Sequence, residues 1–405
     1  MNIFGFGKLI FSFYGKKLPS LYKIQKQGLL AVKIAQHYAL RIDFLGEEMC
    51  THLSQLYTHS FPTEERTLSE LLEGNDDLLK NLASWDENPF SSASVGQVHR
   101  GTLKSGKRVA IKVIRSDFKE SFFRDILRIE RFISFLGKVW PKFNKIFDPN
   151  GILENIKAYT GRELNLVNEY TDMEKLKKIR DSSLQDFDLK SLSFPEVYKE
   201  LSSQRVLVSD YIDGDTLDHL LTEGRLTYDN LLELFRIHSF YIFNKGVFHG
   251  DIHPGNIILG NDKKLYFLDC AGLSTISLRL RKGLFWFFYY LSRYDYPKAA
   301  ENLNKMSQRT LGSQSYSIFL ENFMELYSDF THATVSEVSL TRRMMETIKL
   351  GINSGMDFGS GMFPVIKSLM YLDGMVMRCN PQAVLMDDVR GFTDILLKKL
   401  KNTEK

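Results

Sequence analysis

The chain has 405 residues, of which 43% are hydrophobic and 25% are charged, and its formal net charge is +4. This composition is typical of a soluble globular protein, and the length suits two or three domains or one bilobal enzyme with additions. Because the net charge is small and no long basic run occurs, the sequence gives no reason to expect nucleic acid as a partner.

Cysteine usage and hydropathy bear on the compartment. The three cysteines, Cys50, Cys270 and Cys379, are scattered and form no C-x-x-C pair. This argues against a disulfide framework or a zinc site and favours a reducing compartment. No apolar run approaches the roughly 18–20 residues of a transmembrane helix, and the apolar N-terminus lacks the basic start of a signal peptide. We therefore expect a cytoplasmic protein.

The N-terminal segment mixes aromatic and basic side chains. These are Phe4, Phe6, Phe11 and Phe13, interspersed with Lys8, Lys16, Lys17, Lys23 and Lys26. Two interpretations stay open: a helix packed on the protein's own core, or a peripheral contact with a membrane surface. Residues 28–57 then predict a helix in which Lys33 and Gln36 share one face. Residues 61–87 predict a polar connector with one short helix.

Residues 89–114 combine a loop of small residues with two strands joined by a turn at 104–107. Backbone N–H groups of such a loop can approach phosphates closely. The candidate phosphate-binding residues are therefore Ser92, Ala93, Ser94, Val95 and Gly96. Lys112, in the sequence V-A-I-K, suits contact with the α- and β-phosphates of a nucleotide. The alternative is an edge-strand hairpin whose lysine extends to solvent.

Two helices are predicted next, and then a pair of strands. Apolar residues at spacings of three and four predict a helix over 116–150, and a second helix over 152–179 carries Glu163, Asn165 and Glu169. An acidic residue there could pair with Lys112. The segments 194–198 and 205–212 read as paired strands, the segment 228–245 as a helix that ends at Gly246, and the chain beyond 273 as mostly helical.

The stretch from His249 to Gly272 carries the strongest chemical pattern. Asp251 precedes Asn256 by five residues, and Asp269 follows thirteen residues later. Two short strands, 257–259 and 265–268, predict a hairpin that brings Asn256 close to Asp269, with Asp251 on the loop before it. These oxygen ligands suit Mg²⁺ holding the phosphates of a nucleotide. The alternative is a polar hairpin with structural aspartates.

Five motifs in order resemble the UbiB/AarF family of atypical kinases over roughly residues 29–273. They are Lys33-Ile-Ala-Gln36, Ser91-Ser-Ala-Ser-Val-Gly-Gln-Val98, Lys112, Glu163-Leu-Asn165 with Glu169, and His249 to Asn256. The resemblance implies an α+β, bilobal protein-kinase-like fold with an N-terminal helical extension. It further implies an extension over 1–88, an N-lobe over 89–212 with a helical insert at 116–150, and a C-lobe over 213–405.

The resemblance also implies function: an atypical kinase or ATPase that binds Mg-ATP and supports ubiquinone or other isoprenoid-lipid metabolism, with little protein-kinase activity. Lys112 would hold the phosphates and be oriented by Glu169, and Asp251 would act as base. Asn256 and Asp269 would bind Mg²⁺, helped by Glu163 and Asn165. Lys33 and Gln36 would join Asp251 as catalytic residues, and the helix that carries them would cover the face where a protein kinase binds its peptide substrate. The implied partners are isoprenoid lipids or enzymes of quinone biosynthesis.

The sequence departs from the family pattern at several positions. Asn165 replaces an aspartate, Asp269-Cys-Ala-Gly replaces D-F-G, and Ala35 replaces the glycine of K-x-G-Q. We also expect no hydrophobic C-terminal anchor of the kind found in many bacterial members. The first two departures favour a pseudokinase that uses nucleotide only as a conformational ligand. A small-molecule kinase of the aminoglycoside or choline type, which shares the H-x-D-x-x-x-x-N loop, is a further alternative.

Overall fold

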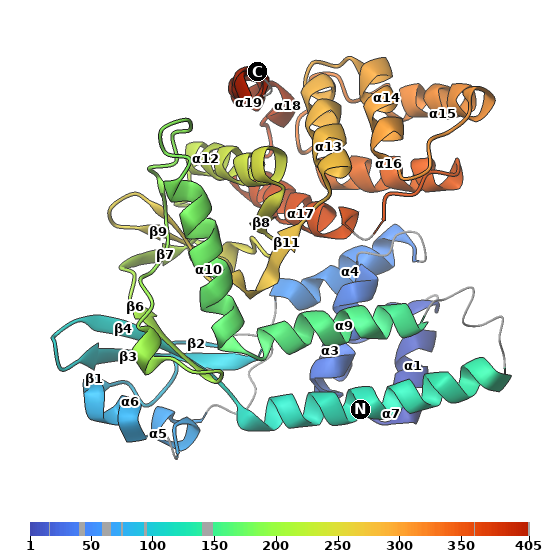
Figure 1. Cartoon of the computed structure of the whole chain (residues 1–405). Coiled ribbons are helices and arrows are strands. Elements are labelled where there is room, and N and C mark those ends of the chain that lie inside the picture. Colours follow the sequence, from blue (N-terminus) through green and yellow to red (C-terminus); the bar gives the residue numbers. More distant parts are fainter. Residues whose placement is uncertain are drawn as a thin grey trace. The chain divides into compact units, whose positions relative to one another are not determined.

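The computed structural model describes residues 1–15, 17–39, 45–58, 66–73, 76–92, 95–139, 149–359 and 361–403 (Figure 1). The chain divides into two compact units. The N-terminal unit comprises Met1–Asp172 and Pro195–Ile212, and the C-terminal unit comprises Met173–Phe194 and Asp213–Lys405. Each unit is described by itself below.

An antiparallel sheet forms one part of the N-terminal unit. Its strands are β1 (Leu82–Trp85), β3 (Gly96–Leu103), β4 (Arg108–Ile114) and β6 (Val206–Asp210), in the order β1-β3-β4-β6, with β2 (Ser91–Ser92) paired to β3. Both strands predicted within 89–114 are confirmed. Val109, Ile111 and Val113 of β4 are fully buried. Because successive side chains of a strand point to opposite faces, Lys112 lies on the face opposite to these three.

The segment 66–85 is more than a connector, so the prediction of one short helix there is wrong. It forms α5 (Leu68–Leu71), α6 (Asp76–Asn81) and the strand β1. Leucines from this segment share a core with the sheet; they are Leu68, Leu71, Leu72, Leu78 and Leu82, packed with Val109, Ile111, Val113, Val206 and Val208. The residues between these leucines are mostly polar and exposed. They made the segment read as a polar connector, although its leucines have the spacing of an apolar helix face.

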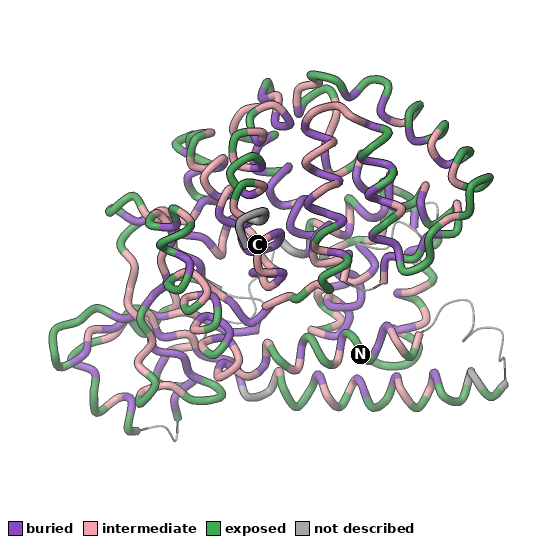
Figure 2. Tube along the Cα trace, turned by 45° about the horizontal axis from the view of Figure 1, so that its top comes forward, coloured by how far each residue is buried: buried purple, intermediate pink, exposed green. Residues whose placement is uncertain are grey.

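Helices form the other part of the N-terminal unit. They are α1 (Ile3–Phe13), α2 (Leu21–Lys26), α3 (Leu29–Ala39), α4 (Glu47–Thr58), α7 (Ser116–Val139) and α9 (Pro149–Glu163). The helix α3 contacts α4, α7 and α9. Buried residues recur every three or four positions along α7, with exposed residues between them (Figure 2), as expected for an amphipathic helix with one face on a core.

Two long helices predicted from the sequence are interrupted. The helix predicted over 28–57 is not continuous, because residues 45 and 46 between α3 and α4 are not helical. The helix predicted over 152–179 is broken at Leu164 and Asn165, and α10 spans Leu166–Asp181. The Asn165 side-chain oxygen accepts a hydrogen bond from the N–H of Val167 at 3.1 Å. An asparagine bonded to the backbone in this way favours a helix start over a helix interior.

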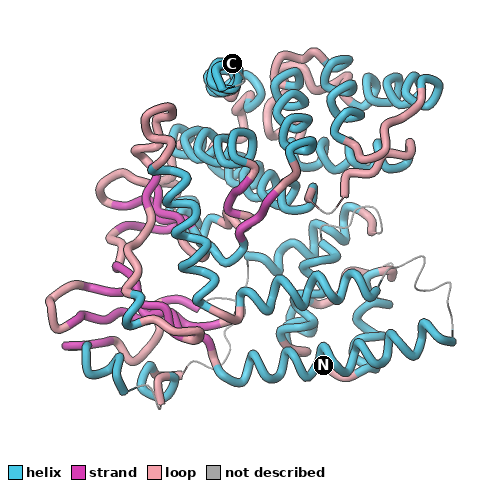
Figure 3. Tube along the Cα trace, viewed as in Figure 1, coloured by secondary structure: helices cyan, strands magenta, loops and turns pink. Residues whose placement is uncertain are grey.

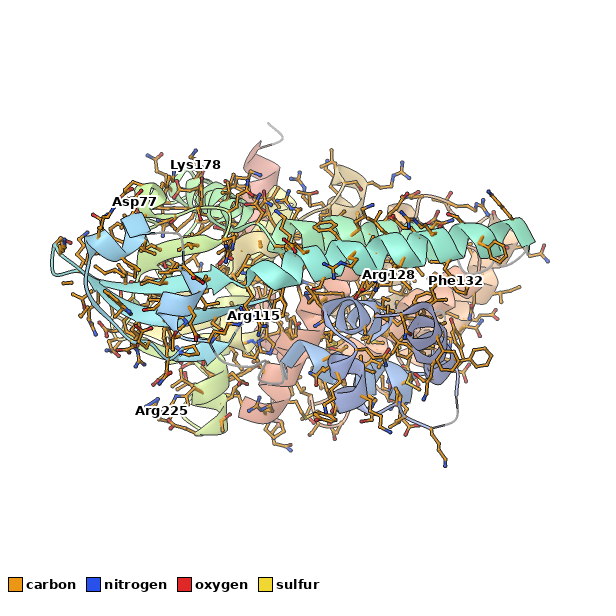
Figure 4. The ribbon with its side chains drawn as sticks, turned by 90° about the horizontal axis from the view of Figure 1, so that it is seen from below. Asp77, Arg115, Arg128, Phe132, Lys178 and Arg225 are labelled. Carbon is orange, nitrogen blue, oxygen red and sulfur yellow. The ribbon has the colours of Figure 1, made fainter. Side chains whose placement is uncertain are left out.

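The N-terminal helix α1 packs through one face only. Phe6 lies edge-on to Phe132 of α7 with ring centroids 6.4 Å apart, and Phe13 packs against Tyr38 of α3 at 5.3 Å. Figure 4 shows Phe132 on α7, next to the N-terminal helices. The predicted packing of this segment on the protein's own core is therefore correct for that face.

The C-terminal unit combines two small sheets with a large set of helices (Figure 3). The strands β5 (Leu192–Ser193), β10 (Leu265–Phe267), β9 (Ile257–Gly260) and β7 (Gly214–Thr216) form one sheet, and β8 (Val247–His249) pairs with β11 (Leu273–Thr275). The helices are α11 (Leu217–Thr222), α12 (Tyr228–Ser239), α13 (Leu278–Leu291), α14 (Tyr296–Met306), α15 (Ser313–Leu326), α16 (Leu340–Asn353), α17 (Met362–Cys379), α18 (Leu385–Asp388) and α19 (Arg390–Thr403).

Several predictions for this half of the chain are confirmed. The hairpin of β9 and β10 forms as expected, and the chain beyond 275 is helical. The helix predicted over 228–245 ends at Gly246, whose φ of 70° suits glycine. Its last turn, Phe240–Lys245, is π-helical rather than α-helical.

The strand predicted over 205–212 forms as β6, and the predicted pairing of 194–198 with it is present, but 194–198 forms no regular strand. This segment makes one bridge to β6, between Val197 and Ser209, and Tyr198 donates its N–H to the carbonyl of Val208. Pro195 has no N–H to contribute to a ladder, and the regular strand β5 lies just before it, where Leu192 and Ser193 pair with β10.

Among the residues described, no helix has the length and apolarity required to cross a bilayer.

Candidate nucleotide-binding site

A buried ion pair on the sheet marks the candidate site in the N-terminal unit. The Lys112 ammonium lies 2.7 Å from a carboxylate oxygen of Glu169, and both side chains are largely buried. Lys112 sits on β4, which pairs with β3 on one side and β6 on the other, so its backbone is held firmly. Glu169 lies in the first turn of α10, where the helix dipole favours an acidic side chain. The structure thus joins the two residues that the resemblance pairs.

The small-residue loop is only partly described. Ala93, Ser94 and the side chain of Ser92 lie outside the described residues. Val95 is buried, and Gly96 begins β3 opposite Ile114. A Cβ atom at Gly96 would approach the carbonyl oxygen of Val113 to 2.4 Å, so close backbone contact in the sheet already requires a glycine there.

A second buried ion pair joins the K-x-G-Q-like motif to the Glu163 motif. Lys33 of α3 lies 2.6 Å from a carboxylate oxygen of Glu163 at the end of α9, and only about a tenth of each side chain is exposed. Gln36, one turn further, donates its amide N–H to the carbonyl of Leu56 on α4 at 2.9 Å. The resemblance assigned Lys33 and Gln36 to a catalytic region and Glu163 to a metal. In this structure Lys33 neutralises Glu163, and both motif residues tie helices of the N-terminal unit together.

The candidate site of the C-terminal unit is built on the β9–β10 hairpin. The Asn256 carbonyl accepts the N–H of Leu268 at 2.8 Å, and its side-chain amide donates to the carbonyl of Asp251 at 3.1 Å. With the amide nitrogen engaged as a donor, the side-chain oxygen of Asn256 is the atom suited to a cation. The hairpin therefore brings the loop of Asp251, Asn256 and the segment before Asp269 together, as the sequence predicts.

His249 and Gly250 hold the loop against the residues on either side of Asp269: His249 contacts Leu268, and the N–H of Gly250 donates to the carbonyl of Gly272 at 3.0 Å. The His249 Nδ1 accepts the N–H of Asp251 at 3.1 Å, so its Nε2 donates to the carbonyl of Leu268, 2.7 Å away. Burial lowers the pKa of His249, consistent with this neutral form. A Cβ atom at Gly250 would come within 2.3 Å of the Gly272 carbonyl, so this position requires glycine.

Asp269 adopts a left-handed backbone conformation, with φ of 49° and ψ of 53°. An aspartate tolerates this region at a small free-energy cost, and residues held there concentrate at functional sites. The turn Cys270–Gly272 that follows is buried. Cys270 thus fills with a small thiol the position that the aromatic residue of D-F-G occupies in kinases.

Lys367 is a residue of the candidate site that the sequence did not reveal. This lysine of α17 places its ammonium 3.0 Å from Oδ1 of Asp251. Burial acts to raise the pKa of Asp251, but the ammonium of Lys367, together with His253 and His249, holds that pKa below its ordinary value. No local motif marks Lys367, because 116 residues separate it from Asp251.

The donor set fits Mg²⁺ bound with a nucleotide. Within the described ranges, no group of three or more His, Cys, Asp or Glu side chains is arranged to hold a metal ion alone. Mg²⁺ usually takes one or two protein oxygens and completes its shell with substrate phosphates and water. Asn256 and Asp269, on neighbouring ends of one hairpin, supply oxygens of this kind.

Comparisons with known proteins agree on the family. The family model for the ABC1 atypical kinase-like domain matches residues 59–303. A probable protein kinase UbiB from Shewanella pealeana is 26% identical over 92% of this chain and 68% of its own length. The Arabidopsis thaliana chloroplast protein ACTIVITY OF BC1 COMPLEX KINASE 8 is 28% identical over 70% of this chain and 37% of its own length.

A solved structure supports the fold. A Mycobacterium tuberculosis protein, determined in complex with erythromycin, has a TM-score of 0.56 at 18% identity, and the match covers 89% of this chain and 91% of that one. The expected α+β, protein-kinase-like fold and the resemblance to UbiB/AarF proteins are confirmed. Since the family model spans more than half of its residues, the chain belongs to the ABC1 atypical kinase-like family.

Proposed function

We propose that this protein binds Mg-ATP and hydrolyses it slowly or transfers its terminal phosphoryl group. The observation that carries the proposal is the buried Lys112–Glu169 ion pair, at 2.7 Å, on the central strand of the sheet. A buried lysine held by a carboxylate is positioned to contact phosphate oxygens. The Asp251–Asn256–Asp269 arrangement follows it in the order found in kinases.

Each candidate residue then has a chemical role. Bound Mg-ATP supplies the transferable phosphoryl group and a divalent charge that offsets its negative charge. Lys112 holds the α- and β-phosphates and Glu169 orients its ammonium. Asn256 and Asp269 would hold the metal ion, and Asp251 would take the proton of the attacking group, which is water in hydrolysis and a substrate hydroxyl in phosphoryl transfer. Glu163 and Asn165 remain candidate helpers, although Lys33 and the N–H of Val167 engage their oxygens here.

The proposed substrate class is an isoprenoid lipid or quinone precursor rather than protein. The relatives named as probable protein kinases UbiB support an atypical kinase role in ubiquinone-related function, whereas the choice of lipid over protein rests on the helix of Lys33 and Gln36 that the family resemblance places over the peptide-binding face. A pseudokinase is the second candidate. Asn165 has no charge to offer a metal ion, and its side-chain oxygen already accepts the N–H of Val167 at the start of α10.

Phosphate release tests the proposal. Purified protein with Mg-ATP should release phosphate slowly, and Asp251→Asn should reduce the rate by about 10²–10⁴-fold, the usual contribution of a general base. Asp262→Asn, in the exposed turn of the same hairpin, is the matched control and should leave the rate unchanged. Labelled ATP should not label added generic proteins. Bound ATP without any turnover would favour the pseudokinase, and rapid labelling of added proteins would contradict the proposed substrate class.

We also propose a peripheral membrane contact through α1. Phe4 and Phe11 are 82% and 84% exposed. Since they are seven residues apart, they share the face of the helix opposite to Phe6 and Phe13. Lys8 and Lys17, both exposed, add positive charge beside them. Aromatic side chains with neighbouring lysines suit an anionic lipid surface.

Replacement of both exposed phenylalanines tests this contact without disturbing the packed face. The double variant Phe4→Ser/Phe11→Ser should bind anionic phospholipid vesicles at least about tenfold more weakly, because each buried Phe contributes about 1.5–3 kcal/mol. Added salt should weaken wild-type binding. Ile318→Ser, which changes an exposed apolar residue of α15 in the other unit, serves as control. Equal vesicle binding by the double variant and wild type would rule the contact out.

A further inference from the structure

A buried lysine from the C-terminal helices reaches the catalytic loop. Lys367 of α17 is buried, and its ammonium lies 3.0 Å from Oδ1 of Asp251. The family model ends at residue 303, so α17 lies outside the matched region. A helix outside the residues matched by the family model thus contributes a charge to the residue proposed as base.

The surroundings of Lys367 fix its position. Its ammonium lies 5.8 Å from the centroid of the Tyr371 ring, one turn along the same helix. That ring in turn meets His253 of the catalytic loop edge-on, with centroids 5.3 Å apart. Lys367 and Tyr371 therefore form one contact surface against the segment from Asp251 to His253.

The helix α17 is itself anchored. Asp373 accepts the hydroxyl of Ser339 at 2.6 Å and the N–H groups of Leu340 and Thr341 at the start of α16. Such an anchor leaves α17 little freedom to slide or rotate. The side chain of Lys367 consequently meets Asp251 from a rigid element, as accurate positioning requires.

The free-energy cost of burying charge indicates that the Lys367–Asp251 pair has a role beyond stability. Removing the Lys367 charge from water costs several kcal/mol, and an apolar residue of similar size often stabilises a core as well or better; the Asp251 side chain stays 25% exposed. A buried lysine aimed at a loop carboxylate is therefore a poor choice for packing alone. An ammonium with three N–H donors can instead hold one carboxylate oxygen in a set direction.

We propose that Lys367 is a positioning residue for phosphoryl transfer. It holds Oδ1 of Asp251 so that Oδ2 faces the attacking group, a water molecule in hydrolysis or a substrate hydroxyl in phosphoryl transfer, whose proton Asp251 takes. The inference rests on the proposed function, since it assigns Asp251 as the base. It makes α17 part of the catalytic machinery and places a functional residue in the part of the chain that the family model does not cover.

The test compares phosphate release by Lys367→Met, Lys367→Arg and Asp251→Asn with that of wild type. Lys367→Met should lower kcat by roughly 10–100-fold, the effect of misplacing a reacting group by about an ångström. The KM for ATP should stay within about twofold. Lys367→Arg should give an intermediate kcat, because its planar fork restores charge in a different geometry. Arg378→Met, which removes an ion pair to Asp218 from the same helix, is the control and should keep the wild-type kcat.

A double variant separates positioning from stability. If Lys367 acts through Asp251, adding Lys367→Met to Asp251→Asn should lower kcat no further. Wild-type kcat in folded Lys367→Met, or an additive loss in the double variant, would overturn the inference. If Lys367→Met does not fold, the Arg variant decides, since wild-type kcat in it would also overturn the inference. Absence of turnover in wild type, or wild-type kcat in Asp251→Asn, would instead overturn the proposed function.

Discussion

The double variant Lys112→Met/Glu169→Gln is expected to bind Mg-ATP about 10–150-fold more weakly than wild type. Charged hydrogen bonds of the kind proposed between Lys112 and the phosphates contribute about 1.5–3 kcal/mol. Both members of the pair are changed together because Glu169, which is almost fully buried, would otherwise be left as an uncompensated charge. Calorimetric titration with Mg-ATP measures the loss.

Lys104→Met is the matched control for this variant. Lys104 belongs to the same strand pair as Lys112 but lies in the exposed turn between β3 and β4. Its replacement removes one positive charge from the turn, as Lys112→Met does from the strand, and should leave the affinity for Mg-ATP unchanged. If the double variant bound Mg-ATP as tightly as Lys104→Met, the ion pair would have no part in nucleotide binding.

Lys33→Met is expected to lower the free energy of unfolding by about 3–5 kcal/mol, because it leaves the buried Glu163 carboxylate without the lysine that neutralises it. The double variant Lys33→Met/Glu163→Gln should recover most of that loss, since no charge is left without a partner. Denaturant unfolding monitored by circular dichroism gives both values. The geometry behind the expectation is the 2.6 Å contact between two side chains that are each about nine-tenths buried.

A more exposed ion pair on α9, the helix that carries Glu163, provides the comparison. Lys157 of α9 lies 2.8 Å from Glu130, but 40% of its side chain is exposed. Water screens such pairs, so Lys157→Met should cost about 1 kcal/mol or less. Equal losses from Lys33→Met and Lys157→Met would mean that the buried pair does not stabilise the N-terminal unit in the way described.

Local sequence patterns predicted those parts of the site whose geometry depends only on residues close together in the sequence. The alternation of V-A-I-K places Lys112 on a strand, and the spacing from Asp251 to Asp269 requires only a short hairpin. The packing of α5 and α6 was missed because polar residues break up their leucines. The interruption at Asn165 was missed because the period of the helix continues across it, while one side-chain hydrogen bond decides the break.

Contacts between distant segments could not be read from the sequence. Lys33 and Glu163 were both identified as motif residues, but their partnership spans 130 residues and depends on how α3 packs against α9. Lys367 had no motif at all, and only the packing of α17 in the C-terminal unit brings it to Asp251. Sequence spacing determines local geometry, whereas tertiary packing determines which charged side chains neutralise one another.

The Mg²⁺ dependence of ATP affinity tests the central proposal most directly. ATP binding is measured by calorimetry in excess Mg²⁺ and in a metal chelator, for wild type and for Asp269→Ala, whose carboxylate is proposed to hold the metal ion. We predict that wild type binds ATP at least about tenfold more tightly with Mg²⁺, as expected for one charged contact of about 1.5 kcal/mol or more, and that Asp269→Ala loses this difference. ATP affinity that does not respond to Mg²⁺ in wild type, or the same response in Asp269→Ala, would contradict the proposed Mg-ATP site.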